Sequence, residues 1–272
     1  MQNFSASPIE MIASLWRNNQ LIRNLIQREV MGRYKGSMLG IFWSMLTPIF
    51  MLVVYTFVFS VVFKARWGTG SDSKTEFALL LFAGLIIFNL FSECISRAPG
   101  LILANVNYVK KVVFPLEVLA WVSMGSALFH CAISLGVWLL AYLVLCGTPH
   151  WHVLLLPVVL LPLVFFVMGL SWVLCSLGVY VRDVGQIIGL VITVLMFLTP
   201  IFYPPSSLPA AYQPLMFMNP LTPPIEMARD LLYWGKLPNL NMLTLYAAGS
   251  LASAVLGFTW FQKTRKGFAD VI

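Results

Sequence analysis

Charged side chains are scarce in this chain, and their scarcity decides its broad class. Only 10% of the 272 residues are Asp, Glu, Lys or Arg, against about 25% in an ordinary soluble domain. Hydrophobic residues make up 60% of the sequence, and the mean hydropathy is +0.86. Several apolar runs reach the roughly 20 residues that a helix needs to cross a hydrocarbon core about 30 Å thick. The composition excludes a soluble fold and predicts a helical protein that crosses the membrane several times.

The sequence also lacks the motifs of nucleotide hydrolysis and of acid–base catalysis. The only Gly-Lys pair, Gly235 and Lys236, precedes Leu237 and has Asp230 where the first glycine of a GxxxxGK[ST] loop belongs. Glu93 is the one acidic residue well inside a predicted span, whereas a proton-coupled carrier normally buries several interacting ionisable groups. We therefore expect no catalytic residue, metal or cofactor in this chain. If it drives transport, the energy must come from a partner.

Cysteines are few and scattered. They form no CxxC pair, so we expect small hydrophobic side chains rather than a disulfide or metal framework. The four positions are Cys94, Cys131, Cys146 and Cys175.

Apolar segments predict six membrane spans in a single transmembrane domain over 1–272. Their bounds are 37–63, 77–97, 116–146, 151–181, 184–203 and 238–262. Most lysines and arginines fall on one side of the membrane if both termini are cytoplasmic, as the positive-inside rule requires. These are Arg17, Arg23, Arg28, Arg33, Lys35, Arg97, Lys110, Lys111, Arg182, Lys263, Arg265 and Lys266. The net charge of +7 is thus expected to reflect topology and not nucleic-acid binding.

An amphipathic helix is predicted over 9–31, ahead of the first span, because apolar residues recur there at steps of three to four with one longer gap. We expect it to lie on the membrane surface. Small residues then follow at intervals of four, at Gly32, Gly36, Gly40 and Ser44. On a helix they form a face without bulk that lets another helix approach. That face fits ordinary packing within one subunit or a subunit interface, and both remain open.

The segment 98–111 is longer than the two to eight residues that commonly join helices of a bundle. Pro99 and Gly100 break the preceding span, and a short apolar turn follows. The pattern predicts a short projecting helix to which a partner docks. Its polar residues are Asn105, Asn107, Lys110 and Lys111. The lysine pair could instead anchor lipid phosphates.

The stretch NPLTPPIEMARDLLYWG (219–235) is too charged to cross a bilayer yet carries helix signals. Thr222 is an expected N-cap, prolines fill the first turn, and Gly235 ends the helix. About twelve helical residues rise roughly 18 Å, little more than half a bilayer core. Together with 205–218, the segment can therefore dip into the membrane and return. The other interpretation is a helix lying on the outer leaflet.

Several motifs in this order resemble one family, the membrane subunits of type-2 ABC exporters. They are REVMGRYKGSMLGIFWSMLTP (28–48), NYVKKVVFP (107–115), YVRDVGQI (180–187), TPIFYP (199–204) and NP...IEMARDLLYWG (219–235). Within that family the chain is most similar to the polysaccharide branch, which exports O-antigen, capsule or teichoic acid. The resemblance covers nearly the whole chain.

The resemblance implies a homodimer in the bacterial inner membrane, paired with two copies of a separate subunit that hydrolyses ATP with Mg. It implies an interface helix at 9–31, a coupling helix at 98–111 and re-entrant external gate helices at 205–235. The implied substrate is a polyprenyl-pyrophosphate-linked polysaccharide taken from the cytoplasm. The partners are then this glycan, the ATPase and membrane lipids, with no nucleic acid.

Three groups of residues become site candidates. Arg28 and Arg33 can bind adjacent phosphates bidentately, with Lys35 as a point charge, although anchoring the topology is the alternative role. Aromatic rings spaced seven apart form one stripe of the first span that could line the path of a sugar chain, or face lipid, or pack in the core. They are Trp43, Phe50 and Phe57. The external gate candidates are Asn219, Pro220, Glu226 and Arg229.

Two other functions compete with polysaccharide export. One is an exporter of drugs or lipids on the same fold. The other is an integral membrane glycosyltransferase or polymerase, which would need acidic catalytic or metal-binding residues in an aqueous loop. The acidic residues of the predicted external loops are few and scattered.

Overall fold

The structure is a computed structural model, and it describes residues 7–62, 67, 74–110 and 114–272. Every regular element in these ranges is a helix, which agrees with the predicted all-α class. Five helices there are long and apolar enough to cross a membrane. They are Gly40–Phe59, Thr75–Gly100, Val118–Cys146, Trp151–Tyr180 and Leu240–Val271.

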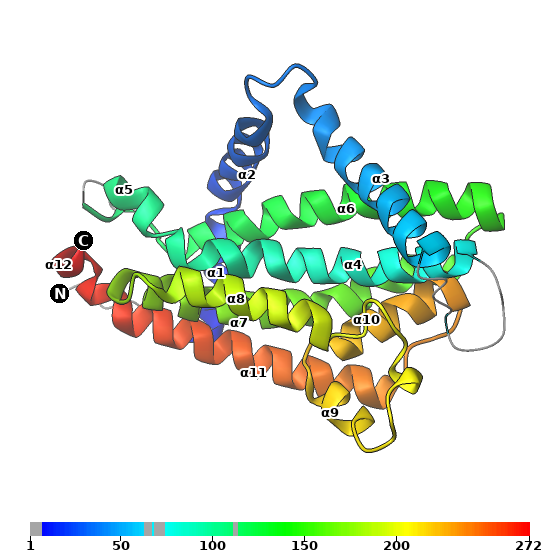
Figure 1. Ribbon diagram of the computed structural model, residues 1–272. Coiled ribbons are helices and arrows are strands. Elements are labelled where there is room, and N and C mark those ends of the chain that lie inside the picture. The colour runs from blue at the N-terminus through cyan, green and yellow to red at the C-terminus, as the bar shows by residue number, and fades with distance from the viewer. Residues whose placement is uncertain (1–6, 63–66, 68–73, 111–113) are drawn as a thin grey trace.

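Four long helices run side by side along the long axis of the bundle (Figure 1). They are α4 (Lys74–Arg97), α6 (Val118–Cys146), α7 (Leu156–Tyr180) and α11 (Leu240–Thr264). The largest hydrophobic cluster gathers around α4 and α7, and it includes Trp138 and Trp172, both fully buried. The core of the bundle is therefore apolar and lies along α4.

Close backbone contact joins α7 to α11. A Cβ placed on Gly257 would lie 2.1 Å from the carbonyl oxygen of Gly169, and one on Gly169 would lie 2.4 Å from the carbonyl oxygen of Ser253. Both glycines let the helix axes approach, as small residues do in membrane bundles. The four cysteines are free, and Cys94, Cys131 and Cys175 are buried like small hydrophobic residues.

The predicted amphipathic helix at 9–31 is two helices, α1 (Pro8–Arg17) and α2 (Asn19–Tyr34). Asn18 separates them, and its Nδ2 donates to the Ser14 carbonyl at 2.8 Å, because short amide side chains compete with the helical backbone. On α1 the side chain of Arg17 donates to Glu10 at 2.5 Å, and this hydrogen bond raises the pKa of Arg17.

A turn separates α2 from α3 (Trp43–Tyr55), so the predicted continuous face of small residues does not form. Gly36 and Gly40 have φ of 88° and 53°, a backbone conformation that interrupts a right-handed helix and suits glycine. Helix α2 leads the chain away from the bundle, and after the turn α3 leads it back (Figure 1). We call α2, the turn and α3 the α2–α3 hairpin. The first predicted span, 37–63, is thus helical from Gly40, through α3 and η2 (Thr56–Val62), and residue 63 lies outside the described residues.

The segment 98–111 contains short helices, as predicted, and not one continuous helix. They are η3 (Ala98–Gly100), η4 (Leu103–Asn105) and α5 (Val106–Lys110). In Figure 1, α5 lies near the short C-terminal helix α12 (Phe268–Val271), which it contacts. The C-terminus lies at this end of the molecule, which we call the terminal end.

The fifth predicted span, 184–203, is too long by five residues. Helix α8 (Val184–Leu198) ends at Leu198, because Thr199 has an extended backbone, with φ −96° and ψ 144°. Thr199 precedes Pro200, and a residue before a proline disfavours helical geometry. Its 15 residues rise about 22 Å, less than the hydrocarbon core of about 30 Å. A sixth complete crossing therefore needs more than this helix.

After α8 the chain forms η6 (Pro205–Ser207), α9 (Gln213–Met218), α10 (Thr222–Arg229) and η7 (Asp230–Trp234). Helix α10 is buried against α4, α7 and α11. The side chains of α10 are thus enclosed mainly by protein, and the depth of 219–235 in the membrane stays a prediction. Gly235 ends the segment in the left-handed conformation, as predicted. Thr222 is not the N-cap, because its hydroxyl donates instead to the Met216 carbonyl at 2.7 Å.

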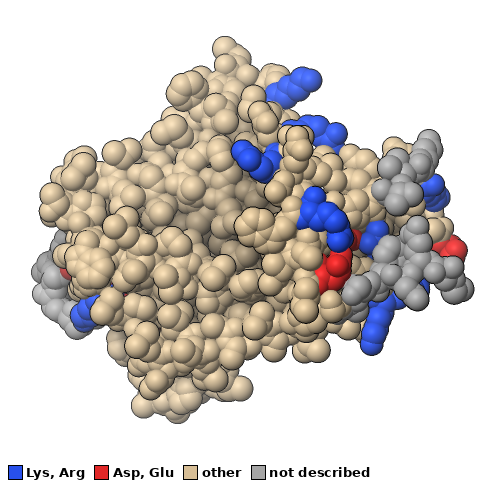
Figure 2. Space-filling view, turned by 180° about the vertical axis from the view of Figure 1, so that it is seen from behind, with Lys and Arg blue, Asp and Glu red and all other residues tan. Residues whose placement is uncertain are grey.

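Positive charge is unevenly distributed over the molecule. Figure 2 shows most of the visible Lys and Arg gathered toward one end of the face that it draws, the terminal end. Most of the remaining surface in that view carries no charged side chain. Lys64 and Arg66 lie outside the described residues. The cytoplasmic placement of both termini stays a prediction.

Candidate functional site

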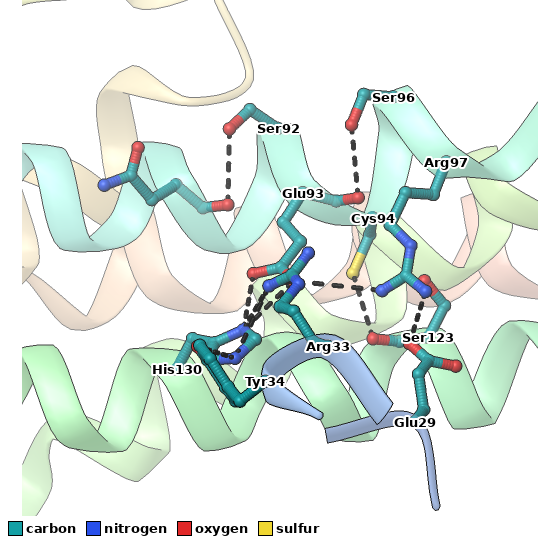
Figure 3. Close-up of polar contacts among 11 residues, drawn as sticks. Glu29, Arg33, Tyr34, Ser92, Glu93, Cys94, Ser96, Arg97, Ser123 and His130 are labelled. Carbon is teal, nitrogen blue, oxygen red and sulfur yellow. Dashed lines mark hydrogen bonds and ion pairs between the residues drawn. The ribbon is translucent and has the colours of Figure 1, made fainter. Parts of the chain in front are cut away.

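An ion cluster lies where the end of α2 meets α4 and α6 (Figure 3). Arg33 Nη1 is 2.8 Å from Glu93 Oε1, and His130 Nδ1 is 3.0 Å from both Glu93 oxygens. One turn further along α4, Arg97 pairs with Glu29 of α2 at 2.5 Å, and its Nη1 is 3.8 Å from Glu93. We call these five residues the Glu93 cluster. It ties α2 to both α4 and α6.

The partners of His130 assign its tautomer. Tyr34 Oη lies 3.2 Å from Nε2, and an ionised Glu93 can only accept hydrogen bonds. A proton on Nδ1 lets the ring donate to Glu93, and the Tyr34 hydroxyl, which both donates and accepts, satisfies Nε2. The 3.0 Å approach of Arg33 Nη1 to Nδ1 is then a contact between two donors that share one carboxylate. Glu93 is the common acceptor of the cluster.

A cavity of about 620 Å³ adjoins the cluster, between the α2–α3 hairpin, α4 and α6. Arg33, Glu93, Arg97 and His130 line it together with apolar side chains. The apolar part includes Met51, Phe82, Leu85, Ile86 and Leu90. Ligand pockets commonly combine an apolar wall with a few convergent polar groups. This one suits an amphipathic molecule with an anionic group.

Of the three residues predicted to receive pyrophosphate, Arg33 alone lines this cavity. Arg28 Nη2 donates instead to the hydroxyl of Tyr108 on α5 at 3.1 Å. The Tyr108 ring stacks on Phe114, with centroids 4.3 Å apart. Lys35 is exposed just beyond the end of α2. The structure thus brings Arg28 to the segment 98–111 and Arg33 to the cavity.

The residues predicted to couple to an ATPase divide into two kinds. Asn105 turns inward, because its Nδ2 donates to the Leu101 carbonyl at 2.8 Å. Asn107 and Lys110 are exposed, while Lys111 lies outside the described residues. The docking of a partner on this segment stays a prediction, with Asn107 and Lys110 as the accessible side chains.

The aromatic stripe of the first span faces away from the bundle. Trp43, Phe50 and Phe57 are 45%, 68% and 58% exposed. Packing in the core of this chain is therefore excluded for these rings. A path for sugar, contact with lipid and contact with a second copy of the chain remain, and the first stays a prediction.

Among the gate candidates, Asn219 joins α8 to α10. Asn219 Nδ2 donates to Thr199 Oγ1 at 3.0 Å, and its Oδ1 accepts from the Leu221 backbone amide at 3.0 Å. Pro220, next to it, is exposed. The asparagine thus fastens the start of α10 to the residue at which α8 ends.

Arg229 is the most unusual gate candidate, because a guanidinium group is fully buried in an apolar bundle. It donates from Nε to Leu80 at 2.9 Å, from Nη1 to Pro200 at 2.5 Å and from Nη2 to Ile201 at 3.0 Å, always to a carbonyl oxygen. Nη1 also donates to Glu226 at 2.6 Å. A buried charge requires such partners. Arg229 fixes α10 to α4 and to the segment after α8.

Two further residues complete the Arg229 site. The guanidinium carbon lies 4.2 Å from the ring centroid of the buried Trp67, a distance at which a cation is attracted by an aromatic face. Gly84 makes room on α4, since a Cβ there would lie 2.7 Å from Arg229 Nη2. The pocket of Arg229 therefore depends on the absence of a side chain at residue 84.

Sequence reasoning missed three partners. His130 is the only histidine of the predicted span 116–146, and Glu93 is the only acidic residue of the predicted span 77–97. These two lone ionisable residues were the signal that could have indicated the pair. Nothing in the sequence indicates the pairing of Tyr108 with Arg28. Glu117 is a third case, because it accepts from Ser14 at 3.0 Å and from Arg265 at 2.6 Å and so joins α1, α6 and η8 (Arg265–Gly267).

Residues 20–233 match the protein family described as ABC-2 type transporter, which is well over half of the chain. The chain belongs to the ABC-2 type transporter family. This membership confirms the resemblance drawn from the sequence motifs and places the chain among transporters rather than enzymes.

Named relatives of this family member extend the match over nearly its whole length. It is 29% identical over 266 residues to the O-antigen export system permease protein RfbA of Myxococcus xanthus, covering 97% of this chain and 100% of that protein. It is 28% identical to RfbA of Klebsiella pneumoniae over 91% of this chain and 93% of that protein. The polysialic acid transport protein KpsM of Escherichia coli is 23% identical over 89% of this chain and 92% of its own length.

Proposed function

We propose that this ABC-2 family chain is the membrane subunit of an exporter that moves a lipid-linked surface polysaccharide, most simply an O-antigen, out of the cytoplasm. The observation that carries the proposal is the end-to-end similarity to an O-antigen export permease, 97% of this chain against 100% of the relative. The cavity beside the Glu93 cluster supports it, because charged side chains at one end adjoin an apolar strip of α4, as a phosphate-bearing lipid requires.

Energy for this transport comes from a separate ATPase subunit that uses ATP and Mg, because this sequence lacks a phosphate-binding loop. The ATPase docks at the terminal end, which is cytoplasmic, on the segment 98–111. Arg28 links α2 to this segment through Tyr108. A movement of this segment is therefore transmitted to the α2–α3 hairpin through a direct contact.

The docking site is tested by cysteine crosslinking in the purified complex. Asn107→Cys on the exposed side of α5 should crosslink to the ATPase, and Ser206→Cys, exposed in η6 near the gate segment, should not. Equal crosslinking from both positions, or none from Asn107→Cys in an intact complex, contradicts the assignment.

The functional unit contains two copies of this chain. The support is α3, whose apolar side chains face outward with few partners in the described part of the chain. Contiguous exposed apolar surface marks a contact with lipid or with another protein. A sixth crossing that begins with α8 and continues in the residues after it, with a re-entrant gate of α9 and α10 that opens to the outside, belongs to the same proposal.

Deleting the gene tests the cargo. Surface polysaccharide should disappear while finished, lipid-linked glycan accumulates inside the cell, and the full-length gene should restore export. A glycosyltransferase or polymerase would instead leave the internal glycan unfinished. An exporter of drugs or lipids would leave the surface glycan intact. Either of these two results rejects the proposal.

A further inference from the structure

The charges of the Glu93 cluster balance. Its two guanidinium groups, Arg33 and Arg97, face two carboxylates, Glu29 and Glu93, so each guanidinium already has a carboxylate partner. A phosphate group that enters the adjoining cavity therefore finds no spare cation among these residues. It can bind strongly only by taking a guanidinium group from a carboxylate, because guanidinium forks bind both anions in the same way.

The geometry selects which pair gives way. Arg97 holds Glu29 at 2.5 Å and is 31% exposed, whereas Arg33 holds Glu93 at 2.8 Å and is 44% exposed. Arg33 is thus the more accessible cation, on the longer contact. Glu93 can release it at low cost, since His130 Nδ1 still donates to the carboxylate and Arg97 lies nearby.

We propose that Glu93 is an internal competitor at a phosphate site: its carboxylate occupies Arg33 when the cavity is empty, and the diphosphate of a prenyl lipid displaces it. This inference rests on the proposed function and adds to it the residue that controls loading. Glu93 and His130 are the members of the site that the sequence did not indicate.

The shape of the cavity identifies the ligand as a lipid diphosphate and not a free anion. From Glu93 the lining continues along α4 through Leu90, Ile86 and Phe82, a run of about 16 Å at the roughly 1.5 Å rise of an α-helix. An apolar chain attached to the phosphate covers this wall. Inorganic diphosphate has no apolar chain, so it would leave this apolar wall uncovered.

Displacement of Glu93 also changes how α2 is held. The pair between Arg33 and Glu93 and the pair between Arg97 and Glu29 both connect α2 to α4. When phosphate takes Arg33, the pair between Arg97 and Glu29 and the contact of Tyr34 with His130 remain, so the α2–α3 hairpin, one wall of the cavity, is held less firmly near its turn. Loading of the substrate and loosening of the hairpin are then one event.

The test is the affinity of the full-length chain, in lipid nanodiscs, for farnesyl diphosphate, with farnesol and inorganic diphosphate as separate arms. Glu93→Gln removes the competing charge but keeps the side-chain shape, so it should bind farnesyl diphosphate about tenfold more tightly than the wild type. Arg33→Gln should lose most of the binding, and Arg33→Lys should recover part of it. Farnesol should bind weakly and equally to all variants.

The matched control is Glu10→Gln, which removes a carboxylate from the Arg17 pair on α1, outside the cavity, and should leave the affinity unchanged. A folded Glu93→Gln that binds no more tightly than wild type overturns the proposal, and so does inorganic diphosphate that binds as tightly as farnesyl diphosphate. If Glu93→Gln does not fold, Glu93→Asp, whose shorter carboxylate retracts from Arg33, should give a smaller gain. Neither of the two results that overturn the proposal affects the surface-glycan test of the proposed function, because that test does not measure lipid affinity.

Discussion

Helices α3 and α4 are both apolar enough to cross a membrane, yet their surroundings are opposite. In the apolar stretch of Gly40–Phe59 6% of the residues are buried, against 83% in Thr75–Gly100. The mean hydropathy of the two stretches is nearly the same, 2.0 and 2.2. Hydropathy thus indicates that a helix can enter the membrane, but it does not indicate whether lipid or protein surrounds that helix.

The polar residues of the two helices explain the difference. Helix α4 carries Glu93 and Arg97 near one end and accepts Arg229 on the Leu80 carbonyl near the other. Each of these groups needs a protein partner in a low-dielectric setting, so α4 is placed where partners surround it. Helix α3 carries no charged side chain and can face lipid or a second subunit. The following variants test this contrast.

The largest effect on stability is expected from Arg229→Leu, which removes the hydrogen bond from Arg229 to the Leu80 carbonyl that joins α10 to α4. Three carbonyl oxygens and Glu226 lose their donor, and breaking a buried charged network typically costs about 3–5 kcal/mol. Denaturant titration in mild detergent should show this loss, and export should fail. Arg182→Leu, at an exposed arginine, is the control and should change stability by less than about 0.5 kcal/mol. Equal stability of the two variants contradicts the role of Arg229.

A smaller effect is expected from Gly84→Ala on α4. The new Cβ would lie 2.7 Å from Arg229 Nη2, and the guanidinium cannot swing aside without losing hydrogen bonds. Overpacking of this kind costs about 1–3 kcal/mol. Gly189→Ala on α8, where no described atom outside the glycine's own helix turn lies within 4 Å of the added Cβ, should be neutral or slightly stabilising. The same denaturant titration compares the pair, and a neutral Gly84→Ala means that Arg229 is not locked in place.

The smallest effect on folding is expected on α3. Phe50→Ala with Phe57→Ala removes two rings that are 68% and 58% exposed, so the stability of the chain should change by less than about 0.5 kcal/mol. Surface polysaccharide should nevertheless fall, with complex assembly and basal ATP hydrolysis near normal. Unchanged export in an assembled complex would return the rings to a lipid-facing role.

Much of the architecture could be predicted from the sequence, because apolar length and breaker residues are local signals. Pro99 and Gly100 correctly marked the end of α4, and Gly235 the end of η7. The turn at Gly36 and Gly40 was missed, since a spacing of four residues also describes a helical face. The end of α8 at Leu198 could have been inferred from Pro200.

Pairings between distant residues could not be predicted from these signals. Arg229 was expected at a gate, but its contact with Leu80 depends on how α10 packs against α4. Arg33 was expected to be open to phosphate, and the structure shows it held by Glu93. Such contacts arise from tertiary packing, which periodicity and spacing in one sequence do not encode.

The shortness of α8 has a consequence for the membrane itself. Its 15 residues fall about 8 Å short of a hydrocarbon core about 30 Å thick, and outward-facing side chains such as Leu190 and Phe197 leave it in contact with lipid or a second copy. Lipids beside a short helix thin to match it, at a cost that grows with each ångström of mismatch. Water and headgroups are then drawn inward toward the exposed end of α8 at Leu198. A sugar chain that leaves near this point has less hydrocarbon to pass than the bulk bilayer presents, and the host's lipid chain length becomes a determinant of export.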